Sequence, residues 1–62
     1  MIVEDVFRIC QTTQYVVVYM GVKVLYEGNV LSIPLNLMPT HVKAIYSKMF
    51  IGGKSTYIVI EV

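Results

Sequence analysis

Few residues of this chain could carry out acid–base or nucleophilic chemistry, and each of them has a simpler structural explanation. His41 is the only histidine, and no aspartate or glutamate lies near it in sequence to orient it as a general base. Cys10 is the only cysteine, and Val6 and Phe7 precede it by four and three positions, as expected for a small core residue on a helix. We therefore interpret His41 as a turn residue and Cys10 as part of the core.

The remaining polar residues fit no catalytic or metal site. The adjacent carboxylates Glu4 and Asp5 fall in the first turn of a predicted helix, where negative charge stabilises the positive end of the helix dipole. One cysteine and one histidine are too few for a closed zinc site, which takes four ligands. Residues 52–55 (Gly-Gly-Lys-Ser) end like a phosphate-binding loop, but position 48, where that motif needs glycine, is lysine. We expect no enzymatic activity, no metal and no cofactor.

One group of residues could bind a partner, because lysines and aromatic residues are interleaved near the C-terminal end. If the chain reverses at Gly52-Gly53, one face of the resulting hairpin carries the aromatic side chains together with one lysine. The candidate site residues are Tyr46, Lys48, Phe50 and Tyr57. Aromatic residues anchor protein interfaces, and nucleic-acid bases stack on them while lysines contact phosphates. Two further lysines, Lys43 and Lys54, flank this group.

The composition limits the class of protein. The chain has 62 residues, of which 56% are hydrophobic and 15% are charged, with a net charge of +1. Disorder is excluded, because disordered segments combine low hydrophobicity with high net charge. The longest apolar run covers only residues 15–20, far short of the roughly 20 residues of a membrane span, and no basic start typical of a signal peptide is present. We expect a single domain over residues 1–62, and a lone cysteine is typical of a protein in a reducing cytoplasm.

Small size and a lone cysteine together predict self-association. A domain of this length buries only about 60% of its unfolded surface, and a single cysteine allows no internal disulfide. With so few charges and five tyrosines, apolar surface should remain exposed in a monomer, and such patches mark interfaces. We expect a homodimer or a larger homo-oligomer.

The first half of the chain predicts a helix and a hairpin. Val3, Val6, Phe7 and Cys10 recur at helical spacing, which predicts an amphipathic helix over residues 3–11, followed by a polar break at residues 12–14. Residues 15–20 are β-branched and aromatic without a polar alternate, as in a strand covered on both faces. Gly21 permits a reversal into a second strand over residues 22–27.

The second half is harder to assign. Pro34 and Pro39 make residues 30–38 an edge segment or an irregular connection, in which Leu31, Ile33, Leu35 and Leu37 alternate and should plug the core. Residues 40–50 fit either a helix that begins at Thr40 or a strand that pairs with residues 55–62. We favour the strand, because a turn at residues 52–53 places sensible partners opposite one another: Ile45–Ile60, Ser47–Ile58, Tyr46–Val59 and Lys48–Tyr57.

These elements predict an α+β fold in which a short N-terminal helix packs on a four-stranded antiparallel sheet built from two hairpins. Five short stretches follow one another along the chain: Val-Glu-Asp-Val-Phe at residues 3–7, Leu-Tyr-Glu-Gly at 25–28, Ile-Pro at 33–34, Leu-Met at 37–38 and Tyr-Ile-Val-Ile-Glu-Val at 57–62. In this arrangement the chain resembles small uncharacterised proteins of phages, prophages and other mobile elements of Gram-positive bacteria. The resemblance implies a location in the cytoplasm of a bacterial host and an extended segment over residues 41–50, and it carries over no catalytic residue.

Two functional hypotheses follow, beside a third in which the chain is a structural component of a phage particle and needs only self-assembly. The first is a small, non-enzymatic, oligomeric interaction protein that binds a larger host protein and inhibits that protein. The resemblance implies this kind of partner, for example a defence nuclease, which anti-CRISPR proteins inhibit. Tyr46, Phe50 and Tyr57 would anchor that interface, with Lys48 at its rim. The alternative is a dimer that binds single-stranded nucleic acid on the same face. Its affinity would fall steeply with salt, because phosphate contacts release counterions.

Overall fold

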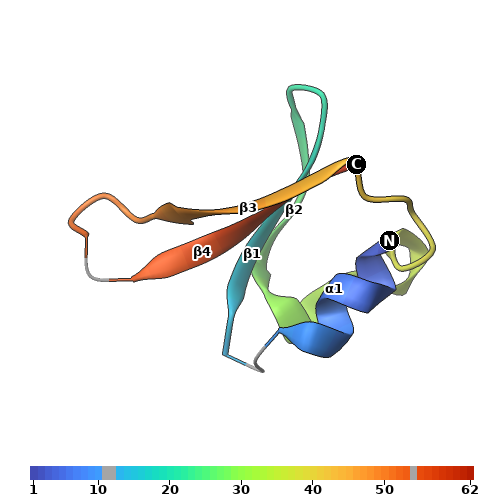
Figure 1. Ribbon diagram of the computed structural model, residues 1–62, viewed down its shortest axis with the longest axis horizontal. Coiled ribbons are helices and arrows are strands. Elements are labelled where there is room, and N and C mark those ends of the chain that lie inside the picture. Colours follow the sequence, from blue (N-terminus) through green and yellow to red (C-terminus); the bar gives the residue numbers. More distant parts are fainter. Residues whose placement is uncertain (11–12, 54) are drawn as a thin grey trace.

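One short helix packs against one face of a four-stranded sheet (Figure 1). The computed structural model describes residues 1–10, 13–53 and 55–62. Its elements are α1 (Val3–Ile9), β1 (Tyr15–Met20), β2 (Lys23–Asn29), two short 3-10 turns η1 (Val30–Ser32) and η2 (Leu35–Leu37), β3 (Ala44–Met49) and β4 (Thr56–Glu61). Three predictions lie outside the described residues: the helix end at residue 11, the start of the polar break at residue 12 and the placement of Lys54.

The sheet is mixed, with the strand order β2-β1-β4-β3. β1 is antiparallel to β2, and β3 is antiparallel to β4, but β1 and β4 lie side by side in parallel. The predicted α+β class is confirmed, whereas the prediction of a purely antiparallel sheet is wrong. The reason is the path of residues 30–43, which return along the sheet so that β3 starts at the same end as β2. Turn signals in the sequence indicate which strand pairs with the next, but they do not specify how the two antiparallel pairs lie next to each other.

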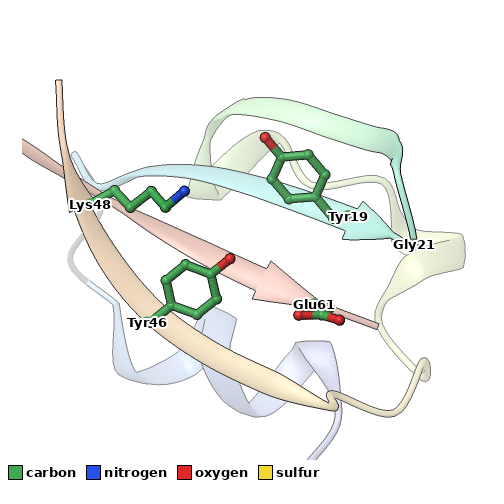
Figure 2. Close-up of a pocket in the computed structure, with 5 residues that line it drawn as sticks. All are labelled: Tyr19, Gly21, Tyr46, Lys48 and Glu61. Carbon is green, nitrogen blue, oxygen red and sulfur yellow. The ribbon is translucent and has the colours of Figure 1, made fainter. Parts of the chain in front are cut away.

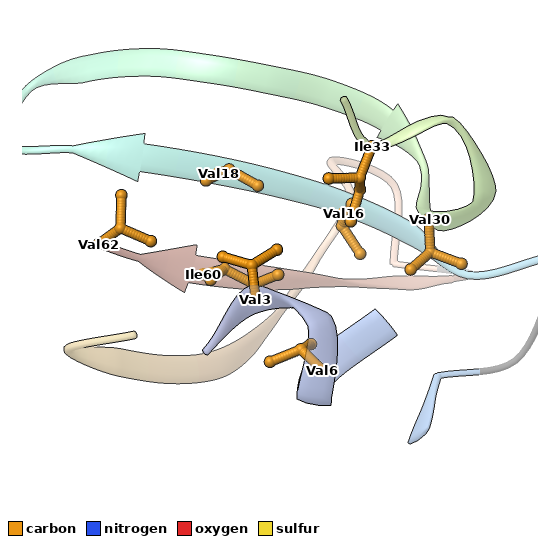
Figure 3. Close-up of a cluster of buried hydrophobic side chains, with 8 residues drawn as sticks. All are labelled: Val3, Val6, Val16, Val18, Val30, Ile33, Ile60 and Val62. Atoms are coloured by element: carbon orange, nitrogen blue, oxygen red, sulfur yellow. The ribbon is translucent and has the colours of Figure 1, made fainter. Parts of the chain in front are cut away.

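The predicted apolar face of α1 is confirmed. Val3 and Val6 are fully buried, and Phe7 and Cys10 pack against the same core. The backbone N–H of Ile2 donates to Oδ2 of Asp5 at 2.9 Å, which satisfies a donor that the first helical turn leaves free. Helical residues end at Ile9. Figure 3 shows the core cluster that forms between α1, the sheet and the connection, made of Val3, Val6, Val16, Val18, Val30, Ile33, Ile60 and Val62.

The connection over residues 30–43 contributes to the core in a different way from the one predicted. Val30 and Ile33 are buried and Leu37 packs against them, but Leu31 is 57% exposed and Leu35 is 84% exposed. The predicted alternation of four core residues is therefore wrong for two of them. The cause is the 3-10 turn η1, because a period of three places residues 30 and 33 on the same side.

Residues 44–49 form strand β3, which decides between the helix and the strand in favour of the strand. The predicted partners are also confirmed, since Ile45 lies opposite Ile60 and Lys48 lies opposite Tyr57. Gly52 and Gly53 adopt φ angles of 108° and 75°, which L-residues rarely adopt, and they reverse the chain between β3 and β4.

Candidate functional site

The face of the sheet opposite α1 carries the candidate residues. Val16 and Val18 of β1 belong to the core beneath α1, so the alternate residues Tyr15, Val17 and Tyr19 lie on the other face. The neighbouring strands add aromatic residues to this face through the pairs Tyr46–Val59 and Lys48–Tyr57. We call it the aromatic face and define it by the rings Tyr15, Tyr19, Tyr46, Phe50 and Tyr57 around Val17 and Val59.

Three rings of the aromatic face pack against one another. The ring centroids of Phe50 and Tyr57 lie 4.8 Å apart, and that of Tyr15 lies 5.2 Å from Phe50 and 6.3 Å from Tyr57. Such pairs stabilise a fold by about 0.5–1.5 kcal/mol beyond the area they bury. Val17 and Val59, next to these rings on paired strands, are only 5% and 1% exposed. The strand β1 is therefore covered on both faces, as its sequence predicts, by the helix on one side and by aromatic rings on the other.

The structure places the four predicted residues on this one face but in two groups. Phe50 and Tyr57 belong to the ring cluster. Lys48 and Tyr46 lie further along the face, with the Lys48 Nζ 5.8 Å from the centroid of the Tyr46 ring, a distance that permits a cation–π contact.

Sequence reasoning missed Tyr15 and Tyr19, which complete the aromatic face, and the carboxylates Glu27 and Glu61 beside them. The alternation within residues 15–19 shows that Tyr15 and Tyr19 share a side. It cannot show that β4 is the neighbouring strand, and that pairing is what joins them to Tyr57.

Two open hollows lie on the aromatic face, with Tyr19 between them. The first, of about 180 Å³, is lined by Tyr19, Gly21, Tyr46, Lys48 and Glu61 (Figure 2). The second, of about 220 Å³, is lined by the ring cluster, by Val17 and Tyr19, by Glu27 and by residues 49 and 51. Each hollow therefore combines tyrosine rings with one carboxylate.

Among the described residues that line the two hollows, Glu27 and Glu61 are negatively charged and Lys48 is positively charged. In the part of the chain that the structure describes, the one ion pair joins Arg8 to Glu4 on α1, at 3.7 Å. Neither residue of this pair lines a hollow. Partial burial, assisted by the neighbouring Glu27 carboxylate, raises the pKa of Tyr15. The face thus presents aromatic rings with carboxylates among them, an arrangement that attracts cations.

The cysteine and the histidine lie away from the aromatic face. Cys10 is half-buried against the core, and this burial raises the pKa of its thiol, which leaves it a poor nucleophile at neutral pH. His41 is exposed and forms an isolated backbone bridge with Ile2. Over residues 1–10, 13–53 and 55–62, no three side chains of the His, Cys, Asp and Glu types come together as metal ligands would.

No helix within those described ranges is long and apolar enough to cross a membrane.

Comparisons of the chain with protein-family models, with curated proteins and with solved structures each returned no match.

Proposed function

We propose that this chain is a non-enzymatic interaction protein that binds a larger protein through its aromatic face. The observation that carries the proposal is the cluster of Tyr15, Phe50 and Tyr57 on the sheet face opposite α1. Aromatic side chains on a rigid sheet anchor protein interfaces, because they offer a large contact area and lose little conformational freedom on binding. The tip of the β3–β4 hairpin extends this surface with Met49, 61% exposed, and Ile51, fully exposed.

The charges of the face favour a protein partner over a nucleic acid. A single-stranded nucleic acid laid across the aromatic face would bring its phosphates close to Glu27 and Glu61, with Lys48 as the cation lining the hollows. Proteins that bind single strands instead follow the backbone with a positively charged groove. A protein surface with arginine or lysine side chains suits the hollows better, since a cation can lie over a tyrosine ring and pair with a carboxylate.

The resemblance to proteins of phages and mobile elements supplies the second part of the proposal. A small protein of that kind would act in the cytoplasm of a bacterial host, where binding to a defence nuclease or another large host protein would block the function of that protein. In this proposal the chain acts by occupying a surface of its target, and it needs no cofactor.

Capture from a nuclease-treated bacterial lysate tests the proposal when it is combined with variants of the face. The tagged protein should retain one large protein near stoichiometry, and the double substitution Phe50→Ala with Tyr57→Ala should abolish this capture. Leu35→Ala is the matched control, because Leu35 is 84% exposed and lies in η2, outside the aromatic face. Circular dichroism should show that both variants remain folded.

Two results would contradict the proposal. Capture that survives in the folded double variant would mean that the aromatic face is not the interface. Binding to a single-stranded oligonucleotide with an affinity that falls steeply with salt would favour the alternative nucleic-acid function.

A further inference from the structure

Strand β3 is the least covered strand of the sheet. It lies at one edge of the sheet, next to β4, and five of its six residues are exposed. Its apolar residues are exposed on both faces, with Ile45 at 41%, Tyr46 at 42% and Met49 at 61%. An edge strand with exposed apolar residues is a template for pairing with another chain.

The opposite edge, β2, has features that oppose such pairing. The register of β2 against β1 shifts between Val18 and Tyr19, which marks a bulge, and β2 carries the charged residues Lys23 and Glu27. Bulges and charges protect a sheet edge from other strands. β3 pairs with β4 over six consecutive residues without a register shift and contains one charged residue, Lys48. Of the two edge strands, β3 is therefore the better suited to regular pairing with a strand of another chain.

Every second residue of β3 directs its backbone N–H and carbonyl groups to the open edge, away from β4. The N–H of Phe50 donates to the carbonyl of Ser55 at 3.0 Å, so residue 50 is turned toward β4. At the other end of the strand the N–H of Lys43 donates to the carbonyl of Glu61 at 2.7 Å, one residue out of this alternation. Within residues 44–49, where the register with β4 is regular, bonded and unbonded positions alternate, so the N–H and carbonyl groups of residues 45, 47 and 49 point outward. These groups form a short ladder centred on Ser47.

A second copy of the same strand is complementary to this ladder in one register. With the two-fold axis at Ser47, Ile45 lies opposite Met49 of the second copy, and Tyr46 lies opposite Lys48 of the second copy. The Tyr46–Lys48 pair occurs twice, in the unbonded positions where side chains are closest, about 4.5 Å between Cα atoms, and it places a cation against a tyrosine ring. Moving the axis to Lys48 would instead set two lysines directly opposite each other, which is unfavourable.

We propose that the protein forms a symmetric homodimer by antiparallel pairing of β3 with β3 of a second copy, centred on Ser47. The dimer joins two sheets into one continuous eight-stranded sheet and places two aromatic faces side by side. This proposal is independent of the larger protein partner, because it rests on the edge of β3 and not on the ring cluster.

Disulfide trapping tests the register. In a Cys10→Ala background, Ser47→Cys should form a disulfide-linked dimer on mild oxidation, because the Cα atoms of a bonded antiparallel pair lie about 5.5 Å apart, within the range that a disulfide spans. Ile45→Cys is the matched control on the same strand. Its copies would lie roughly 13 Å apart, four residues along the ladder, and should not cross-link. Mixing Ile45→Cys with Met49→Cys should restore cross-linking between the two variants.

Light scattering tests the dimer itself. The wild-type protein should show twice the 7.0 kDa mass of one chain, and Ser47→Pro should return it to the single-chain mass. Proline removes an N–H that faces outward, so the pairing of β3 with β4 and the circular dichroism spectrum should be retained. Ser47→Ala keeps this N–H and should stay dimeric. A wild-type mass of 7.0 kDa at every soluble concentration, a dimer that survives in Ser47→Pro, or cross-linking of Ile45→Cys with itself would overturn the proposal.

Discussion

Ile45 and Ile60 form a matched pair that tests how α1 covers the sheet. The two isoleucines lie directly opposite each other on β3 and β4 and share one face of the sheet, but Ile60 is fully buried whereas Ile45 is 41% exposed. Ile60→Ala should leave a cavity beneath α1 and cost about 3 kcal/mol of unfolding free energy, within the usual range for a buried isoleucine. Ile45→Ala removes atoms that are already partly in water and should cost about 1 kcal/mol.

These losses are large for a protein of this size. A chain of 62 residues typically has an unfolding free energy of roughly 3–9 kcal/mol, and each 1 kcal/mol shifts the melting temperature by about 4–8 °C. Ile60→Ala should therefore lower the melting temperature by about 12–24 °C. If it unfolds the chain entirely, Ile60→Val provides the milder test, with an expected loss of about 1 kcal/mol.

Urea denaturation followed by far-ultraviolet circular dichroism gives the two free energies. The series should be repeated at several protein concentrations, because pairing between copies would add a stabilising term that depends on concentration. Equal losses for Ile45→Ala and Ile60→Ala at low concentration would refute the reasoning. That outcome would mean that α1 covers the edge strand β3 as well as the inner strands β1 and β4.

Three other predictions concern a tyrosine, the cysteine and the helix cap. Partial burial and the Glu27 carboxylate raise the pKa of Tyr15, so its contribution to stability is complete below the unfolded pKa of about 10 and is lost as the pH rises toward the higher folded pKa. In an alkaline absorbance titration one tyrosine should titrate late, and Tyr15→Phe should remove that late step; its persistence would assign it to another residue. Burial also raises the pKa of Cys10, so iodoacetamide should alkylate it more slowly in the native protein than in urea, and equal rates would contradict its place against the core. Asp5→Ala removes the acceptor of the Ile2 N–H and should cost about 1 kcal/mol, whereas Arg8→Ala breaks only an exposed ion pair and should change stability by less than about 0.5 kcal/mol; similar losses for both would mean that Asp5 does not cap the helix.

The parts of the fold that could be predicted are those that neighbouring residues specify. The spacing of Val3 and Val6 identifies the buried side of α1, because a helical period is a local property. The pairing of Lys48 with Tyr57 follows from the turn at residues 52–53, since a turn determines the register of the strands it joins.

The parts that could not be predicted depend on how distant segments meet. The parallel pairing of β1 with β4 requires residues 30–43 to cross the whole sheet, and no pattern within that connection specifies its path. Half of the candidate site could not be predicted for the same reason, because Tyr15 contacts Phe50 and Tyr57 only when β1 pairs with β4. Leu31 and Leu35 are exposed for a similar reason, since the alternation assumed an extended chain and the 3-10 turns have another period.

The parallel pair at the centre of the sheet has a consequence for the kinetics of folding. Each antiparallel pair joins strands that are neighbours in sequence and can close within microseconds, but Val16 meets Ile58 across roughly 40 residues of chain, and contacts of such long range form slowly. Before they form, β1 and β4, which supply much of the core, present open apolar edges. Refolding at high protein concentration should therefore divert chains into aggregates at this stage, and dilution should recover the native yield.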